Sequence, residues 1–304
     1  MQLKNNNKSA FLIGNLCMLV ATIFWGINVT ATKVLIPDWM TANGVSAVRI
    51  VGACILFWIV SLFMKNDRIQ KGDWLRIISG GTVGLFLFII LFVTSLRYAN
   101  PIDVSIIMTL PPMFVILIGV IFRHQRPSLI EYAGVVVSLI GAVVVIVAGG
   151  AGKNGSDNLL GDILAVASTV CYALYLTLLE KPSQTYRPVT LLRWVFLFAA
   201  IPALVLIPGM RHMPILHATE AMPWLTISFI LLCPTFLAYF LVQPAEKGIG
   251  SELVSIYQYL VPVFATVSAV MAGIDRLHWI QVLAMAVIIV GMVLTNIGKR
   301  RRKP

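Results

Sequence analysis

Apolar residues run through the chain in long blocks, and short polar breaks separate the blocks. A helix that crosses a bilayer needs roughly 17–25 mostly apolar residues, and ten segments of the chain meet that requirement. They are residues 10–34, 42–64, 74–95, 100–122, 129–149, 160–180, 188–208, 222–243, 250–273 and 279–298. The pattern therefore predicts an all-α membrane protein with ten transmembrane helices.

The breaks between these segments carry turn chemistry. Residues that favour turns occupy most of them, for example Asn66-Asp67, Asn100-Pro101, Arg187-Pro188 and Pro208-Gly209. Because most of the links are short, neighbouring helices are expected to run antiparallel. The apolar stretch that begins at Ala10 continues to about Ile36, which is too long for the ~7–15-residue core of a signal peptide. It is therefore expected to be a retained first span.

Composition supports the membrane class. Hydrophobic residues make up 59% of the 304 residues and charged residues 12%, against about 45–50% and about 25% in soluble domains. The mean hydropathy is +0.91. This excess of apolar surface needs the lipid bilayer as its partner, because lipid accepts helices that are apolar on every face. The four cysteines lie in separate apolar segments, so we expect small buried side chains rather than a metal site.

The net charge of +11 raises the question of a nucleic-acid partner, because basic patches bind phosphate backbones. The placement of the charge argues against it. With a cytoplasmic N-terminus, inner segments hold sixteen Lys and Arg residues and outer loops hold four. This asymmetry follows the positive-inside rule. It predicts a multi-pass protein of the cytoplasmic membrane with both termini in the cytoplasm and no nucleic-acid partner.

The chain also resembles itself after a shift of 150 positions. The shift superimposes Val104-Ser105-Ile106 on Val254-Ser255-Ile256, Pro112 on Pro262, and Arg126 on Arg276, and a slightly different shift pairs Arg49 with Arg193. The chain is therefore predicted to consist of two halves, 1–150 and 151–304, with five helices each. Five is odd, so the second half enters the membrane from the opposite side, as in the inverted repeats of alternating-access transporters.

These features together resemble the EamA-type branch of the drug/metabolite transporter superfamily, over nearly the whole chain. The resemblance rests on Phe24-Trp25-Gly26-Ile27-Asn28, Arg49, Leu110-Pro111-Pro112-Met113-Phe114 with Arg126-Pro127 after it, and Leu260-Val261-Pro262-Val263-Phe264. It implies a carrier with a cavity between its halves, commonly an exporter of amino acids or related metabolites.

The chain departs from that family in its acidic residues. The family usually has an acid in the loops after its fourth and ninth helices, where this chain has Gln125 and Asp275. Small four-helix multidrug members of the superfamily carry a glutamate in their first helix, but residues 10–34 contain no acid. Cation export by that mechanism is therefore disfavoured.

Arg49 and Arg193 are the foremost candidates for substrate binding. A charge within a span costs about 2.5–3.5 kcal/mol on insertion scales, so it usually faces a cavity or a partner. Two such cations would attract a carboxylate or another anion. The alternative is that each side chain extends to the membrane interface, which is within its reach.

Further candidates lie in the first, fourth, sixth and ninth spans. An aromatic wall with hydroxyls and amides suits an amphipathic metabolite, although packing and helix–helix bonds explain the same residue types. These candidates are Trp25, Asn28, Thr109, Tyr172, Tyr175, Tyr257 and Gln258.

The fourth and ninth spans carry acids at their starts and prolines in their middles. Asp103 and Glu252 are expected to stabilise helix dipoles rather than to carry protons. Pro111, Pro112 and Pro262 interrupt the spans and allow bends at equivalent points.

No catalytic set, phosphate-binding loop, metal site or cofactor motif stands out in the sequence. We therefore expect a secondary transporter of small molecules, most simply a monomeric exporter of metabolites such as amino acids, and not an enzyme. The alternatives are a drug or nucleotide-sugar carrier and, with less support, a membrane-embedded transferase acting on lipid-linked substrates.

Overall fold

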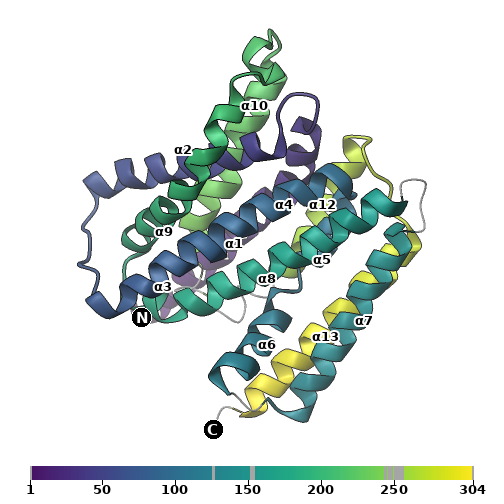
Figure 1. The fold of residues 1–304 in the computed structure, drawn as a ribbon. Helices are drawn as coiled ribbons and strands as arrows, with labels where there is room; N and C mark the ends of the chain where they lie inside the picture. The colour runs from purple at the N-terminus through teal and green to yellow at the C-terminus, as the bar shows by residue number, and fades with distance from the viewer. Residues whose placement is uncertain are drawn as a thin grey trace.

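The computed structural model describes residues 2–124, 127–150, 155–242, 245, 249 and 257–302. Within these residues every regular element is a helix (Figure 1). In chain order the elements are α1 (Gln2–Leu35), α2 (Ala42–Phe63), η1 (Lys71–Asp73), α3 (Trp74–Ser79), η2 (Gly80–Phe86), α4 (Leu87–Tyr98), α5 (Pro101–Ile107), α6 (Pro111–Arg123), α7 (Leu129–Gly150), α8 (Gly155–Thr185), α9 (Pro188–Ala203), η3 (Leu204–Met210), η4 (Pro214–His217), α10 (Ala221–Ile230), η5 (Leu231–Leu237), η6 (Gln258–Leu260), α12 (Val261–Met271) and α13 (Trp279–Arg302).

The all-α membrane class predicted from the sequence is confirmed. In the described part of the chain, nine helical segments are long and apolar enough to cross a membrane, and a shorter apolar helix covers Gln258–Met271. The shorter helix corresponds to the predicted span 250–273, which begins outside the described residues. Some helices are longer than predicted: the span expected at 160–180 reaches from Asn158 to Thr185.

The outward surface of the bundle is strongly apolar. Large side chains such as Phe63, Leu129 and Met271 are more than four-fifths exposed, which in water would be unfavourable and in lipid is not. Polar residues such as Thr22, Ser105 and Thr169 lie in the interior instead. This distribution is that of a protein whose solvent is the bilayer.

Helices α7 and α13 lie side by side along most of their length (Figure 1). Glycines permit this close approach, because a Cβ atom added at Gly134 would lie 2.4 Å from the carbonyl oxygen of Gly291. Small residues at such contacts are the usual means by which helices associate in a membrane.

A network that we call the loop joint connects residues 65–73, after α2, with residues 186–190, after α8. The Tyr186 hydroxyl donates to Asp73 Oδ2 at 2.8 Å and accepts from the Gln70 amide at 3.0 Å. Asp67 Oδ2 accepts from the Arg187 amide at 2.6 Å. Burial raises the pKa of the Tyr186 phenol above its ordinary value, and the bond to Asp73 acts in the same direction.

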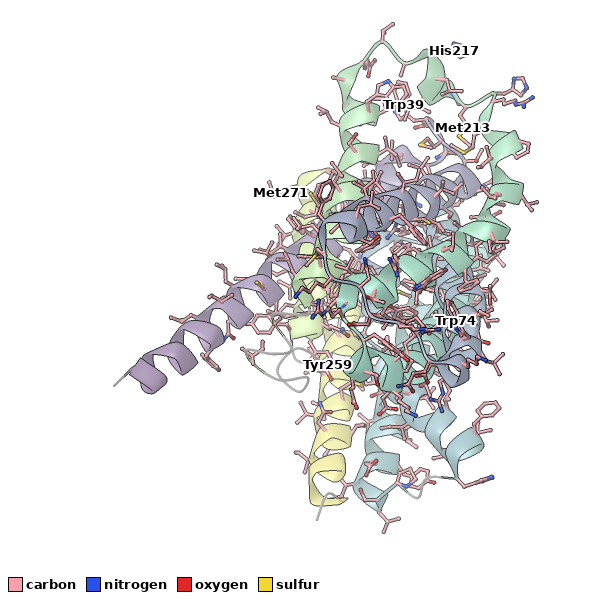
Figure 2. The ribbon with its side chains drawn as sticks, turned by 90° about the vertical axis from the view of Figure 1, so that its left-hand side faces the viewer. Trp39, Trp74, Met213, His217, Tyr259 and Met271 are labelled. Carbon is pink, nitrogen blue, oxygen red and sulfur yellow. The ribbon has the colours of Figure 1, made fainter. Side chains whose placement is uncertain are left out.

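The opposite end of the bundle is closed by a second contact between distant segments. The Ile215 amide donates to the Trp39 carbonyl oxygen at 3.0 Å, and Trp39, Met213 and His217 lie at the same end of the molecule (Figure 2). The start of α1 and the end of α13 lie toward the other end (Figure 1), as an even number of spans requires.

The fourth span is broken, and the described part of the ninth span changes helix type at a matching point; we call these two points the breaks. Helix α5 ends before a turn at Met108–Leu110, and α6 begins at Pro111; in the ninth span η6 gives way to α12 at Val261. The residues before the two new helices, Leu110 and Leu260, have nearly the same backbone angles, φ −81° and ψ −7° against φ −83° and ψ −12°. The prolines at the second position of each new helix, where no helical N–H is needed, account for the restart.

The two breaks are 150 residues apart, the same shift that superimposes the sequence on itself. A second matched feature lies in the third and eighth spans, where η2 and η5 are both π-helices of seven residues. The inverted relation between the halves, and their limits at 1–150 and 151–304, stay predictions.

Candidate functional site

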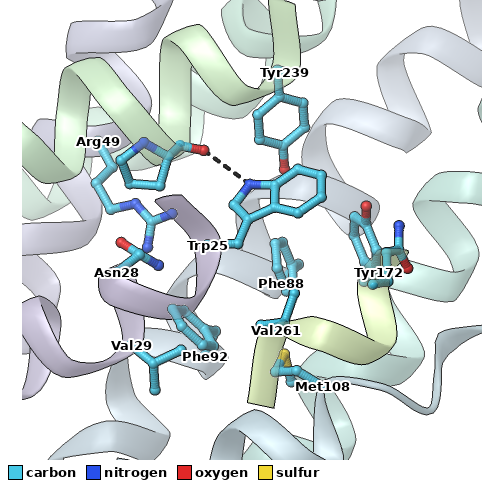
Figure 3. Close-up of a pocket in the computed structure, with 12 residues that line it drawn as sticks. Trp25, Asn28, Val29, Arg49, Phe88, Phe92, Met108, Tyr172, Tyr239 and Val261 are labelled. Carbon is cyan, nitrogen blue, oxygen red and sulfur yellow. Dashed lines mark hydrogen bonds between the residues drawn. The ribbon is translucent and has the colours of Figure 1, made fainter. Parts of the chain in front are cut away.

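A pocket lies in the interior of the bundle, where the fourth and ninth spans meet the first, second, third, sixth and eighth spans (Figure 3). Its lining is mostly apolar and aromatic with a few polar groups, which is the usual composition of a small-molecule site. The lining residues are Trp25, Asn28, Val29, Arg49, Phe88, Phe92, Met108, Tyr172, Pro234, Tyr239, Gln258 and Val261.

Arg49 supplies the charge of the pocket. It is 5% exposed, its Nε donates to Thr235 Oγ1 at 3.1 Å, and its guanidinium carbon lies 5.7 Å from the centre of the Phe92 ring. Its Nη1 atom is buried and has no hydrogen-bond partner in the described part of the chain. One face of the guanidinium is thus fixed by the protein, and Nη1 is left as a donor without an acceptor.

The π-helix η5 shapes the site around Arg49. Pro234 lies inside η5 and has no N–H to donate, so the ordinary helical ladder is interrupted there. The Thr235 hydroxyl donates to the carbonyl oxygen of Ile230, five residues earlier, at 2.7 Å. This bond orients the hydroxyl oxygen so that it can accept from Arg49.

The same π-helix also positions Trp25. The carbonyl oxygen of Pro234 accepts a hydrogen bond from Trp25 Nε1 at 3.1 Å (Figure 3). Tyr239 packs edge-on to the indole, with ring centres 6.3 Å apart. At the next residue, a Cβ atom at Gly26 would lie 2.4 Å from that of Phe264, so only glycine lets α1 come this close to α12.

Asn28 and Arg49 lie on one side of the pocket, and Tyr172 lies on the other (Figure 3). Asn28 is 4% exposed, and its Oδ1 accepts a long hydrogen bond of 3.4 Å from Thr32 Oγ1. The opposite wall is aromatic: the Phe88 ring lies 4.8 Å from that of Tyr172, centre to centre. The pocket therefore has a cationic side and an aromatic side.

The structure brings five of the nine predicted site residues to this pocket: Trp25, Asn28, Arg49, Tyr172 and Gln258. The other four do not line it. Tyr175 stacks behind Tyr172 at 5.7 Å, and Thr109 donates to the carbonyl oxygen of Ile106 within the helix break.

Tyr257 and Arg193 do not line the pocket either, and each side chain has partners outside it. The Tyr257 hydroxyl donates to Asn15 Oδ1 at 2.8 Å, on the first helix. The Arg193 guanidinium lies over the rings of Trp58 and Trp194, at 5.1 and 5.4 Å. A role for either residue in substrate binding stays a prediction.

Several residues of the site carry no signal in the sequence. Phe88 and Phe92 are four residues apart in an apolar helix, a spacing that lipid-facing and pocket-facing aromatics share. Thr235 and Tyr239 gain their roles from the π-helix, which Pro234 alone does not predict. The pairing of one arginine with one hydroxyl across 186 residues appears only in the folded chain.

Comparisons with known proteins agree with this architecture. The model of the EamA-like transporter family matches residues 12–147 and 159–297. The chain is similar to the uncharacterized transporter YyaM of Bacillus subtilis, with 24% identity over 286 residues that cover 92% of each chain. It is also similar to the uncharacterized inner membrane transporter YicL of Salmonella typhimurium, with 22% identity over 95% of this chain and 97% of the relative.

A solved crystal structure has the same fold. It covers 97% of this chain and 99% of its own, with a TM-score of 0.61 and 20% sequence identity. At that identity the likeness concerns the fold alone. The two family matches fall on either side of residues 148–158, close to the predicted junction of the halves.

Proposed function

Since the chain belongs to the EamA-like transporter family and is a multi-pass membrane transporter, we propose that its pocket binds a small metabolite with a carboxylate, such as an amino acid. The protein exports this substrate by alternating access. It works without a bound cofactor, and the gradients of substrate and coupling ion drive it.

The observation that carries this proposal is Nη1 of Arg49, which has no hydrogen-bond partner among the described residues. A buried cation without its full set of acceptors is costly, and a carboxylate that accepts from it forms a charge-assisted bond. The Thr235 hydroxyl holds Nε in place, so little side-chain entropy is lost when the substrate binds. Arg49 is thus prepared for an anionic group before that group arrives.

The rest of the pocket suits the remainder of an amino acid. The amides of Asn28 and Gln258 can accept hydrogen bonds from an ammonium group. The rings of Phe88 and Tyr172 offer an apolar surface for a side chain on the opposite wall. Helices α6 and α12 begin next to the pocket at the two breaks, and their N-terminal dipole ends favour a negative charge there.

The two breaks also provide the movement that the proposal requires. A helix interrupted at the binding site can tilt on one side of the site while the other side stays in place. The outer and inner walls of the pocket then open in turn. The positive-inside bias of the sequence supports a cytoplasmic position for the loop joint, for both termini and for the end of α6 at Arg123.

The experiment is a flux assay in proteoliposomes with a panel of radiolabelled amino acids. We compare the wild type with Arg49→Gln and with Arg97→Gln, which changes an exposed arginine at the end of α4. Saturable flux whose KM rises about 10- to 100-fold in Arg49→Gln and is unchanged in Arg97→Gln supports the proposal. Equal flux in all three proteins removes Arg49 from the mechanism. If no amino acid moves, the same assay is repeated with lipophilic drugs and nucleotide sugars, and flux of those would overturn the proposed substrate class.

A further inference from the structure

Asp162 is a buried acid to which no described residue donates a hydrogen bond. It lies in α8, four residues into the span Asn158–Thr185, and its residue is 0% exposed. Neither carboxylate oxygen has a hydrogen-bond partner in the described part of the chain. An ionised carboxylate in such a place lacks both water and donors, which is among the most costly arrangements in a protein interior.

Asp162 lies where α8 packs on the turn between α4 and α5. A Cβ atom at Gly161 would be 2.4 Å from the backbone nitrogen of Ala99, so the two backbones touch. The Lys33 ammonium donates to the carbonyl oxygen of Ala99 at 3.0 Å. Asp162 is within electrostatic range of Asp103, on the helix that follows this turn. Three spans therefore meet around the acid.

Asp103, unlike Asp162, is hydrogen-bonded. It is 2% exposed, and its Oδ1 accepts from Gln281 Nε2 at 2.7 Å. The sequence predicts Asp103 in the first turn of a helix, where it stabilises the helix dipole, and the structure finds it in that turn with its side chain buried. Asp275 completes the group: its Oδ2 accepts from the Ile102 amide at 3.2 Å. Burial raises the pKa of the Asp275 carboxyl, against the lowering effect of its backbone hydrogen bonds.

Among the described residues no cation compensates Asp162. Asp103, Asp162 and Asp275 supply three carboxyls, and Lys33 on α1 interacts electrostatically with Asp275. The other charged or titratable groups of the described elements nearby are Arg97, which lies over the Tyr98 ring, and the exposed Arg276 and His278. Within the described part of the chain, the charged group that acts on Asp162 is the like-charged Asp103. One added proton on Asp162 removes the charge for which the described residues offer no donor.

Helices α8 and α5 connect Asp162 and Asp103 to the pocket. Asp162 and the pocket residue Tyr172 lie ten positions apart on the continuous helix α8, about 15 Å along its axis. Asp103 lies on α5, which ends one residue before the pocket residue Met108. Between them, the Ser168 hydroxyl contacts Met108 Sδ at 4.0 Å. A change in the packing of α5 against α8 therefore reaches both the helix break and the aromatic wall.

We propose that Asp162, with Asp103 beside it, is the proton-binding site that couples substrate movement to the proton gradient. The proton binds to an Asp162 carboxylate oxygen from one side of the membrane and leaves it toward the other, while the substrate moves in exchange. This inference rests on the proposed transport function, and it adds the coupling ion and the residue that binds it.

The transport test compares wild type, Asp162→Asn and Asp73→Asn in proteoliposomes with a mixture of radiolabelled amino acids. Asn has the shape of a protonated Asp but cannot release a proton. Asp73 is a matched control, because it is an equally buried aspartate that Arg76 and Tyr186 already hold in the loop joint.

We expect the wild type and Asp73→Asn to accumulate label about tenfold for each unit of imposed pH gradient at one-to-one exchange. Asp162→Asn should exchange label across the membrane without accumulating it. Accumulation by Asp162→Asn that responds to the pH gradient as the wild type does overturns the proposal, and so does accumulation driven by a sodium gradient in its place.

A second measurement does not depend on the substrate. Infrared difference spectra of the purified wild type, recorded while the pH is stepped, should contain the carbonyl band of a buried carboxylic acid. That band should be missing in Asp162→Asn and present in Asp73→Asn and in Asp162→Glu. A wild type without the band, or an Asp162→Asn variant that keeps it, contradicts the proton site even when no amino acid is transported, so its failure is separate from that of the substrate class.

Discussion

Arg49 and Arg193 are the same residue type in the second and seventh spans, yet the fold uses them differently. Each has a buried guanidinium nitrogen without a hydrogen-bond partner among the described residues. Arg49 lines the pocket and is fixed by Thr235, whereas Arg193 lies over two tryptophan rings. An unpaired donor thus indicates a binding role only where a pocket gives an anion access to it. Aromatic faces satisfy the other cation without a ligand.

The largest expected effect is that of Arg49→Gln. Loss of a charge-assisted bond to the substrate should raise KM by about 10- to 100-fold, from roughly 1.5–3 kcal/mol. Thermal stability should stay the same or rise, because an incompletely paired buried charge is removed. Initial rates over a range of substrate concentration measure the first effect, and thermal unfolding in detergent measures the second. If Arg49→Gln has the KM of the wild type, Arg49 does not bind the substrate and does not differ from Arg193 in this respect.

Thr235→Val should have the next largest effect. The Arg49 Nε loses its acceptor, and its guanidinium is no longer held in one orientation. We expect a rise in KM of about fivefold, from a hydrogen bond of about 1 kcal/mol. Thr235→Ser restores the hydroxyl and should restore KM. If Ser and Val behave alike, the methyl group and not the hydrogen bond is what matters at this position.

Tyr186→Phe provides a reference from a site in which the polar atoms are paired. Removal of the hydroxyl that bonds Asp73 and Gln70 should lower stability by about 1 kcal/mol and leave KM unchanged. Because the native pKa of Tyr186 is raised, its contribution is complete below the ordinary tyrosine pKa of about 10 and is lost as pH rises through the native value. Unfolding curves of the two proteins should therefore converge at alkaline pH, and a constant gap would contradict the assigned bonds.

Arg193→Gln should have the smallest effect. The cation–π contacts with Trp58 and Trp194 contribute about 0.5–1 kcal/mol, so a small loss of thermal stability is expected with KM within about twofold of the wild type. A large rise in KM would place Arg193 in the transport path, as the sequence suggested, and would break the distinction drawn between the two arginines.

The sequence predicts the spans well, because each needs a long apolar block and the blocks are plain. It also predicts interruptions near Pro111, Pro112 and Pro262, since proline cannot continue a helical ladder. It does not predict that Thr235 meets Arg49, because that contact depends on a π-helix whose register is set by tertiary packing. Asp162 has no signal either, because a single acid near the end of an apolar block is also typical of a solvated helix start. Its burial, next to the contact of Gly161 with Ala99, appears only in the folded chain.

A thermodynamic cycle between Arg49 and the substrate's carboxylate tests the pocket without reference to transport rates. The dissociation constants of wild type and Arg49→Gln are measured by calorimetry for the amino acid with the highest flux and for the amine that lacks its carboxylate. If Arg49 binds the carboxylate, the amine that lacks the carboxylate should bind the wild type about 10- to 100-fold more weakly than the amino acid does. Arg49→Gln should bind the two ligands with nearly equal affinity. An equal loss in both proteins would mean that the carboxylate binds elsewhere and that Arg49 is not its partner.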